Sequence, residues 1–395
     1  MLSASAPLPV ATLLDEMAAG MHGPVTREFC SQMHLRSFAL LRLPPSMRAE
    51  VDAMRDAAAA FFNLSAERKA AVGDFRVVGD TYVGYRDSAA CDAEFLELHV
   101  TANGRAFPEV SSELSASMVA LHRRLSRLGR SLLRGMAAHI GVDPAAFLAP
   151  LSPLDSELEG ATDPDPSCGP SCEPSKLSST VLRLCHYRSS KSERGVGGRG
   201  VGAICDSSSE QVSEQVSAQV SEQVSEQVLF DEHTDSSLLT LSLLCPNAAA
   251  LQLADAAAAG DDPWVCVEEG AATLMDLEVH TGDFLAFLTR DFYPACVHRV
   301  VRPREDAERV SMPLLLRVCP RHELDTRPYD PLRTNHHLVE IEGVRCRDLG
   351  RLLDMRGQRA LERRRMAASA EVQRKARAQA YREEIRAGRA LSPVE

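Results

Sequence analysis

Apolar residues recur at the spacing of an α-helix in two segments of the N-terminal third. In residues 48–62 and 111–141 they return every three or four positions, which gives each helix one apolar face. The longer stripe consists of Leu114, Met118, Leu121, Leu125, Leu128, Leu132 and Met136. Ser111 or Ser112 can cap this helix and Gly141 can end it. The same periodicity places five arginines on the outer, solvated face: Arg123, Arg124, Arg127, Arg130 and Arg134.

Short apolar runs of strand length occupy much of the remaining chain. In the first half, strands are predicted at residues 37–43, 82–86, 94–100 and 181–187. Beyond residue 231, such runs follow one another with turns and no helix between them: residues 238–244, 251–253, 264–267, 273–275, 284–288, 295–301 and 311–318. Their frequency predicts an all-β sandwich or jelly roll in this part of the chain.

These patterns divide the chain into four parts. Residues 1–150 form a mixed helical N-terminal region, and residues 151–230 are loop-rich with one core strand at 180–188. Residues 231–321 form a jelly-roll core, and residues 322–395 are a C-terminal extension with a basic helix. That helix is expected to be solvated, with docking to an acidic partner as the alternative. The expected fold class is mainly β with flanking helices.

Two low-complexity features lie between residues 151 and 230. The tetrapeptide Ser-Glu-Gln-Val repeats through residues 209–228, and one valine per turn can bury little apolar surface. We expect an exposed or disordered insertion there, with a dimerising helix as the alternative. Cys168 and Cys172 could form half of a zinc site or a redox pair, but no second pair accompanies them, so we expect incidental loop cysteines.

Composition narrows the functional class. The chain has 395 residues and a net charge of -11, which argues against a nucleic-acid binder. It holds no apolar run of about 18 residues, so no membrane association is expected. The first 20 residues lack a targeting signal, and the 11 cysteines follow no disulfide framework. The cytoplasm is therefore the expected location, and the sequence does not indicate an oligomeric state.

The segment around residue 233 carries the clearest chemistry. His233 and Asp235 stand two positions apart before an apolar run, and alternate residues of an extended segment point to the same side. The pair could therefore offer two ligands to one metal ion, with His298 from a later strand as the third. Two histidines and one carboxylate leave open coordination positions, as in non-haem Fe(II) oxygenases. A polar strand end without metal is the alternative for the His-x-Asp pair alone.

Five motifs occur in one order, and together the chain resembles the 2-oxoglutarate/iron(II)-dependent dioxygenases of the isopenicillin N synthase-like family. The resemblance covers residues 27–321. It rests on a Phe-Phe-x-Leu-x-x-x-x-Lys signature, the three metal-ligand candidates, a Gly-Asp pair, an Arg-x-Ser pair and a tyrosine. The residues concerned are Phe61, Phe62, Leu64, Lys69; His233, Asp235, His298; Gly282, Asp283; Arg309, Ser311; and Tyr187.

The resemblance implies a double-stranded β-helix core and an oxidoreductase that uses Fe(II), 2-oxoglutarate and O2. It further implies oxidation of a small organic substrate by hydroxylation or desaturation, with release of succinate and CO2. His233, Asp235 and His298 would hold the iron, while Arg309, Ser311 and Tyr187 would bind the cosubstrate. An arginine fork suits the far carboxylate of 2-oxoglutarate. A surface arginine pairing with Asp306 or Glu308 is the alternative for Arg309.

The chain departs from the family pattern at Cys185, where the family often has asparagine two residues before the tyrosine. The predicted strands at 82–86 and 94–100 suggest a substrate pocket, with half-buried sheet positions as the alternative. Its candidate residues are Tyr82, Tyr85, Arg86, Phe95 and Glu97. Two other functions remain open at this point: an iron oxidase of the same fold that does not use 2-oxoglutarate, and an inactive metal-binding interaction protein.

Overall fold

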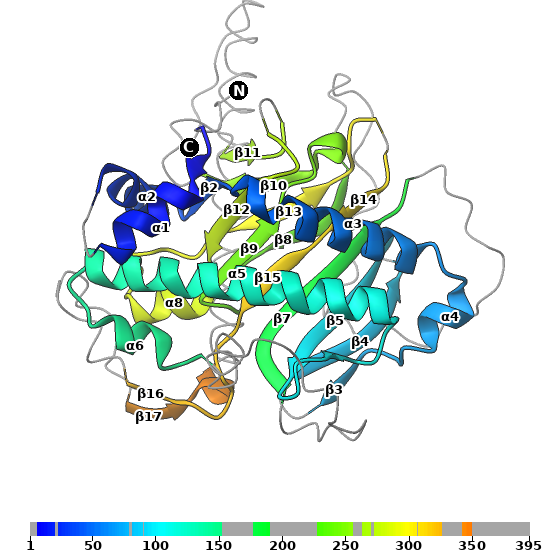
Figure 1. The fold of residues 1–395 in the computed structure, drawn as a ribbon. Helices are drawn as coiled ribbons and strands as arrows, with labels where there is room; N and C mark the ends of the chain where they lie inside the picture. Colours follow the sequence, from blue (N-terminus) through cyan, green and yellow to red (C-terminus); the bar gives the residue numbers. More distant parts are fainter. Residues whose placement is uncertain are drawn as a thin grey trace, which may run out of the picture.

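The computed structural model describes residues 6–19, 23–78, 81–89, 91–151, 177–189, 227–255, 263–269, 272–305, 307–325 and 342–349. Its core is built from a large sheet and a smaller one (Figure 1). The large sheet has the strand order β1-β2-β12-β9-β15-β7-β5-β4-β3, with β14 beside β7 and β6 beside β5, and the small sheet has the order β11-β10-β13-β8. A third, two-stranded sheet pairs β16 with β17. This two-sheet core confirms the expected double-stranded β-helix.

The bounds of the strands are as follows: β1 Leu8–Pro9, β2 Phe38–Arg42, β3 Arg76–Val78, β4 Thr81–Ser88, β5 Ala93–Thr101, β6 Ala106–Phe107, β7 Leu177–Tyr187, β8 Val228–His233, β9 Leu239–Leu243, β10 Leu251–Ala254, β11 Trp264–Cys266, β12 Asp276–Thr281, β13 His298–Val301, β14 Arg309–Ser311, β15 Pro313–Leu316, β16 Glu323–Asp325 and β17 Glu342–Arg345. The helices are α1 Val10–Ala18, α2 Pro24–Arg36, α3 Arg48–Phe62, α4 Ala66–Ala70, α5 Ser112–His139, α6 Pro144–Leu148 and α8 Asp283–Leu288.

Helix α5 crosses one face of the large sheet, and α3 packs beside it (Figure 1). Its N-cap is Ser111, whose side chain accepts a hydrogen bond from the Leu114 amide at 3.3 Å, as predicted. The apolar stripe is buried against strands of the sheet. At Gly129 a Cβ would lie 2.5 Å from a Leu316 methyl carbon, so helix and sheet approach closely there. One arginine differs from the expected outer face, because Arg130 is buried.

Two predicted strands of the core are wrong. Residues 284–288 belong to helix α8. An apolar run this short has no periodicity that separates a buried helix from a buried strand, so the sequence pattern did not distinguish them. Residues 273–275 form a turn, in which the Thr273 amide donates to Asp276 Oδ2 at 2.7 Å. The strand follows as β12, and its alternating Asp276, Glu278 and His280 concealed it in the apolar pattern.

Several sequence features lie outside the described residues. These are the Cys168/Cys172 pair, residues 209–226 of the repeat and most of the C-terminal basic segment. Among the described residues, no helix is both long enough and apolar enough to cross a membrane.

The end of the repeat, however, is paired into the small sheet. Val228 begins β8 and pairs with Val301 of β13, and the Arg302 amide donates to the Gln227 carbonyl at 2.8 Å. We expect excision of residues 209–225 to leave thermal stability and turnover nearly unchanged, because the repeat can bury little apolar surface. Thermal unfolding and activity of the shortened chain test this. A collapse in soluble yield would show that the repeat packs, and excision through Val228 should itself damage β8.

Candidate metal centre and cosubstrate pocket

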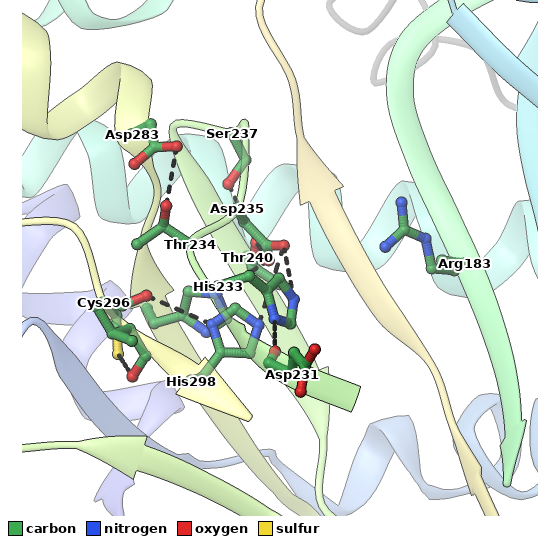
Figure 2. A network of polar contacts seen from close by, with 12 residues as sticks. Arg183, Asp231, His233, Thr234, Asp235, Ser237, Thr240, Asp283, Cys296 and His298 are labelled. Atoms are coloured by element: carbon green, nitrogen blue, oxygen red, sulfur yellow. Dashed lines mark hydrogen bonds and ion pairs between the residues drawn. The ribbon is translucent and has the colours of Figure 1, made fainter. Parts of the chain in front are cut away.

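His233, Asp235 and His298 converge at the open end of the small sheet (Figure 2). His233 ends β8 and lies directly opposite His298, which begins β13, so their rings stand 4.1 Å apart between centroids. Asp235 follows two residues after His233. One ligand atom from each of the three side chains lies within 4.8 Å of the others. The structure thus brings His298 from a later strand next to the His-x-Asp pair.

The donor atoms suit a metal ion better than they suit one another. Nε2 of each histidine lies 4.0 Å from Asp235 Oδ1, which is too long for a hydrogen bond. Two donor atoms can stand 4.0 Å apart when each lies about 2.0–2.2 Å from one metal ion between them. Burial lowers the pKa of both histidines, which keeps the rings neutral as metal ligation requires. Backbone carbonyls accept from the Nδ1 atoms, at Asp231 (2.8 Å) and Cys296 (3.4 Å), leaving Nε2 to the metal.

Asp235 has one oxygen bound and one left for the metal. Its Oδ2 accepts from Thr240 Oγ1 at 2.6 Å and from His280 Nε2 at 3.0 Å. His280 in turn donates through Nδ1 to Glu278 at 2.9 Å. Burial alone would lower the pKa of His280, but the carboxylates of Glu278 and Asp235 outweigh it and raise that pKa to about 10. These hydrogen bonds occupy Oδ2 and leave Oδ1 of Asp235 directed toward His233 and His298.

The sequence reasoning missed Glu278 and His280. Both belong to β12, whose residues 276–281 are all buried. A strand that alternates polar residues with Leu277 and Val279 was the available signal. Glu278 and His280 face the same way in a buried strand, so their polar groups need hydrogen-bond partners, and Asp235 is the partner of His280.

We expect His280→Ala to weaken metal binding by about 10–100-fold, the usual effect of losing a group that orients a metal ligand. Asp235 would keep its Oδ1 but lose one of the two hydrogen bonds that fix Oδ2. Titration with Mn(II) or Co(II) measures this without turnover. His34→Ala is the control, because His34 bonds the Phe292 carbonyl instead. Equal metal affinity of the His280 variant and the parent would contradict the expectation.

The three cosubstrate candidates lie together beside the triad. Strand β14 pairs with β7 so that Arg309 lies opposite Tyr187 and Ser311 opposite Cys185. All four line the cavity that also contains His233, Asp235 and His298. Cys185 stands where the family often has asparagine, and burial raises the pKa of its thiol to about 11. A neutral, weakly polar thiol therefore replaces an amide at this position.

Arg309 is not a surface arginine. Its side chain is only 1% exposed, and it pairs with the buried Glu268. Glu308 instead lies 3.5 Å from His186, and Asp306 lies outside the described residues. The structure therefore overturns the alternative in which Arg309 is an exposed arginine in a local ion pair.

The five substrate-pocket candidates have different surroundings. Phe95 lines the cavity, and Arg86 covers the Phe95 ring at 4.9 Å. Glu97 accepts from Arg183, which also lines the cavity and faces the triad from β7 (Figure 2). Tyr82 is 49% exposed and stacks on Phe75, and the Tyr85 hydroxyl donates to Glu94; neither is among the cavity-lining residues.

Arg183 is a further cavity residue that the sequence reasoning missed. Its Nε and Nη2 bond Glu97 Oε1 at 2.9 and 2.7 Å, which holds the guanidinium in place on the wall facing the triad. A single arginine inside the otherwise apolar run 181–185 was the available signal. Such a charge is retained in a core strand only when it is paired, as it is here.

The Phe-Phe-x-Leu-x-x-x-x-Lys signature has a structural explanation. Lys69 donates to the Phe62 carbonyl at 3.1 Å and also to the buried Glu94, which in addition accepts from Tyr85 and His186. Burial raises the pKa of Glu94, but these hydrogen bonds outweigh it and lower the pKa to about 2. The signature thus fixes the end of α3 and α4 against β5 and β7, which carry the cavity wall.

The Glu94 network should make stability depend on pH. Because the folded pKa lies below the unfolded one, Glu94 stabilises the fold above about pH 4.5, and that contribution is lost as pH falls toward 2. We expect Glu94→Gln to cost about 2–3 kcal/mol at neutral pH. Urea unfolding should show the gap to the parent closing below about pH 4.5. Glu308→Gln, which removes an exposed carboxylate near the same His186, is the control, and a gap independent of pH would contradict the assignment.

A larger hollow of about 660 Å³ lies elsewhere, between α1 and α5. Its wall is mainly apolar with Arg124, Arg127 and Arg134, and it contains none of the triad. We therefore assign the candidate site to the smaller cavity at the end of the small sheet, because that cavity contains the potential metal ligands.

Comparison with known proteins agrees with this geometry. Residues 210–318 match the model of the 2OG-Fe(II) oxygenase superfamily. The chain carries a 2OG-Fe(II) oxygenase domain. This confirms the family resemblance, the fold class and the expected enzyme class, an oxidoreductase that uses Fe(II), 2-oxoglutarate and O2. No curated protein sequence matches the chain.

Solved structures share the fold of this oxygenase. A full-length Neurospora crassa protein in complex with alpha-KG and 5-formyluracil is 17% identical, with a TM-score of 0.59 over 87% of this chain and 94% of its own. A putative 2OG-Fe(II) oxygenase family protein from Caulobacter crescentus is 19% identical, with a TM-score of 0.56 over 90% and 99%. The dioxygenase for auxin oxidation from rice is 15% identical, with a TM-score of 0.52 over 85% and 92%.

Proposed function

We propose that this oxygenase oxidises a small organic molecule at an Fe(II) ion held by His233, Asp235 and His298, with release of succinate and CO2. The observation that carries the proposal is the convergence of these three side chains in one cavity with Arg309, Ser311 and Tyr187. Bound iron with open coordination positions would supply O2 activation coupled to decarboxylation of 2-oxoglutarate. The remaining roles belong to the side chains of the chain itself.

Hydrogen bonds within the protein orient the three metal-ligand candidates without a metal ion. The carbonyls of Asp231 and Cys296 fix the two histidine rings, and His280 with Thr240 fixes the carboxylate. Ligands held in this way need little rearrangement on binding. The arrangement also leaves room for exogenous ligands, because only three protein donors converge in the described part of the chain.

The cosubstrate side of the cavity offers a buried cation and hydroxyl groups. Arg309 would contact the far carboxylate of 2-oxoglutarate, with Ser311 and Tyr187 as hydrogen-bond donors beside it. Burial raises the pKa of the Tyr187 hydroxyl well above its ordinary value, so it stays a donor at neutral pH.

The aromatic part of the cavity lining suits a small molecule with an apolar body. Phe95 and Phe230 pack edge to face at 5.9 Å, and the Phe230 ring lies 4.6 Å from that of His233. Arg183, whose guanidinium is held by Glu97, adds a charged group to the same lining. Small molecules are also the ligands named for the Neurospora crassa protein, which was crystallised with thymine and with 5-formyluracil.

The decisive experiment combines binding and turnover. Fe(II) and 2-oxoglutarate are titrated anaerobically, and air is then admitted in the presence of a metabolite library while succinate is measured. We expect 2-oxoglutarate to bind only when metal is present, and succinate release to increase with the true substrate. Metal binding without any 2-oxoglutarate binding would contradict the proposal.

A further inference from the structure

Glu268 is a buried carboxylate that the metal and cosubstrate roles leave unexplained. It lies in the turn after β11, its side chain is fully buried, and it belongs to no sequence motif. Its Oε1 accepts from the Cys245 amide, and its Oε2 accepts from the amides of Ala250 and Leu251, each at 2.9 Å. Three backbone donors therefore fix both oxygens before any side chain is considered.

Arg309 uses only part of its guanidinium on this carboxylate. Nε and Nη2 lie 3.3 and 2.8 Å from the two Glu268 oxygens, so one edge of the fork is fully used. Nη1 is buried and has no hydrogen-bond partner in the part of the chain that the structure describes. Arg309 also lines the cavity of the triad. A buried N–H group without a partner calls for an explanation, and at the wall of a cavity a ligand can supply the acceptor.

We propose that Glu268 is a positioning residue for the cosubstrate: it holds Arg309 by one edge so that the Nη1 edge meets the far carboxylate of 2-oxoglutarate. Backbone amides hold Glu268 in place, and Glu268 in turn holds Arg309, so we infer that Glu268 orients Arg309 and not the reverse. The inference rests on the proposed cosubstrate site.

The pairing has a second consequence for selectivity. Glu268 offsets the charge of Arg309, so the pair has no net charge with which to attract anions in general. Recognition then depends on hydrogen-bond geometry at the free edge, where a carboxylate makes short, charge-assisted bonds. The site should therefore distinguish keto acids by whether they carry a carboxylate at the far end.

Two ligands test this on the full chain with Mn(II) in place of Fe(II). 2-Oxoglutarate and 2-oxopentanoate share the metal-binding end, but only the first has the far carboxylate. Calorimetric titration gives the ratio of their dissociation constants for the parent, Glu268→Gln and Glu268→Asp. We expect Glu268→Gln to reduce the preference for 2-oxoglutarate by about tenfold, the loss of a well-placed charged hydrogen bond. Affinity for Mn(II) and for 2-oxopentanoate should stay close to that of the parent.

If Glu268 had a purely structural role, its substitution would weaken the binding of both ligands equally and leave the preference for 2-oxoglutarate unchanged. An unchanged or increased preference would overturn the proposal. Glu268→Asp keeps the charge and both acceptor oxygens but shortens the side chain by one methylene group, so it gives the same test with an intermediate loss if the glutamine variant does not fold. Glu269→Gln is the matched control, since this neighbouring carboxylate is 38% exposed and pairs with Arg304. A parent without preference for 2-oxoglutarate would instead reject the cosubstrate site itself.

Discussion

Replacing Asp235 by alanine should abolish detectable metal binding at micromolar concentrations and, with it, succinate release. Asp235 supplies the single carboxylate of the donor set, and only its Oδ1 faces both histidine Nε2 atoms. Without it two neutral imidazoles remain, which cannot offset the charge of a divalent ion in a buried site. Equilibrium dialysis with Fe(II) or Mn(II) measures the loss directly.

The same variant should remain folded, which separates loss of ligand from loss of structure. It loses an acceptor for His280 and Thr240, so a moderate decrease in thermal stability is expected. Asp231→Ala is the matched control, because this exposed carboxylate lies on β8 and only its backbone carbonyl contacts His233. Retained metal affinity in a folded Asp235 variant would exclude this triad as the iron site.

Replacing Arg309 by alanine should raise the dissociation constant for 2-oxoglutarate by about 10²–10⁴-fold, in line with the roughly 3–5 kcal/mol cost of a buried charge that loses its partner. Arg309→Lys keeps the charge but not the two-edged fork, so it should lie between the alanine variant and the parent. Metal affinity should be unchanged, because Arg309 is not one of the three metal-ligand candidates. Calorimetry with Mn(II) in place of Fe(II) measures both constants.

The alanine variant carries a second cost. It leaves Glu268 buried with its three amide donors but without a cation, so the free energy of unfolding should also fall. Thermal unfolding separates this effect from binding, and Arg304→Ala, which removes a 68% exposed arginine, is the control. A folded, metal-binding Arg309 variant with the parent's 2-oxoglutarate dependence would favour an iron oxidase of the same fold that does not use the cosubstrate.

Local sequence patterns determined the elements and the ligand pair. The stripe of α5 with its Ser111 cap depends on helical periodicity, and the His-x-Asp pair depends on alternation in an extended segment. The family resemblance also singled out Arg309 and Ser311 as an Arg-x-Ser motif, and the structure places both in the cavity lining. Such features involve neighbours along the chain, so their geometry can be predicted without the fold.

The tertiary structure alone decided which polar groups surround those motifs. Glu268, His280 and Arg183 come from a turn and two different strands, and their partners Arg309, Asp235 and Glu97 lie 41, 45 and 86 residues away along the chain. The helix at 284–288 was likewise visible only in the structure, because an apolar run this short has no periodicity that separates a helix from a strand. Strand pairing over long sequence separations sets these contacts. A buried polar residue looks like any other in the sequence until the fold supplies the partner that makes its burial favourable.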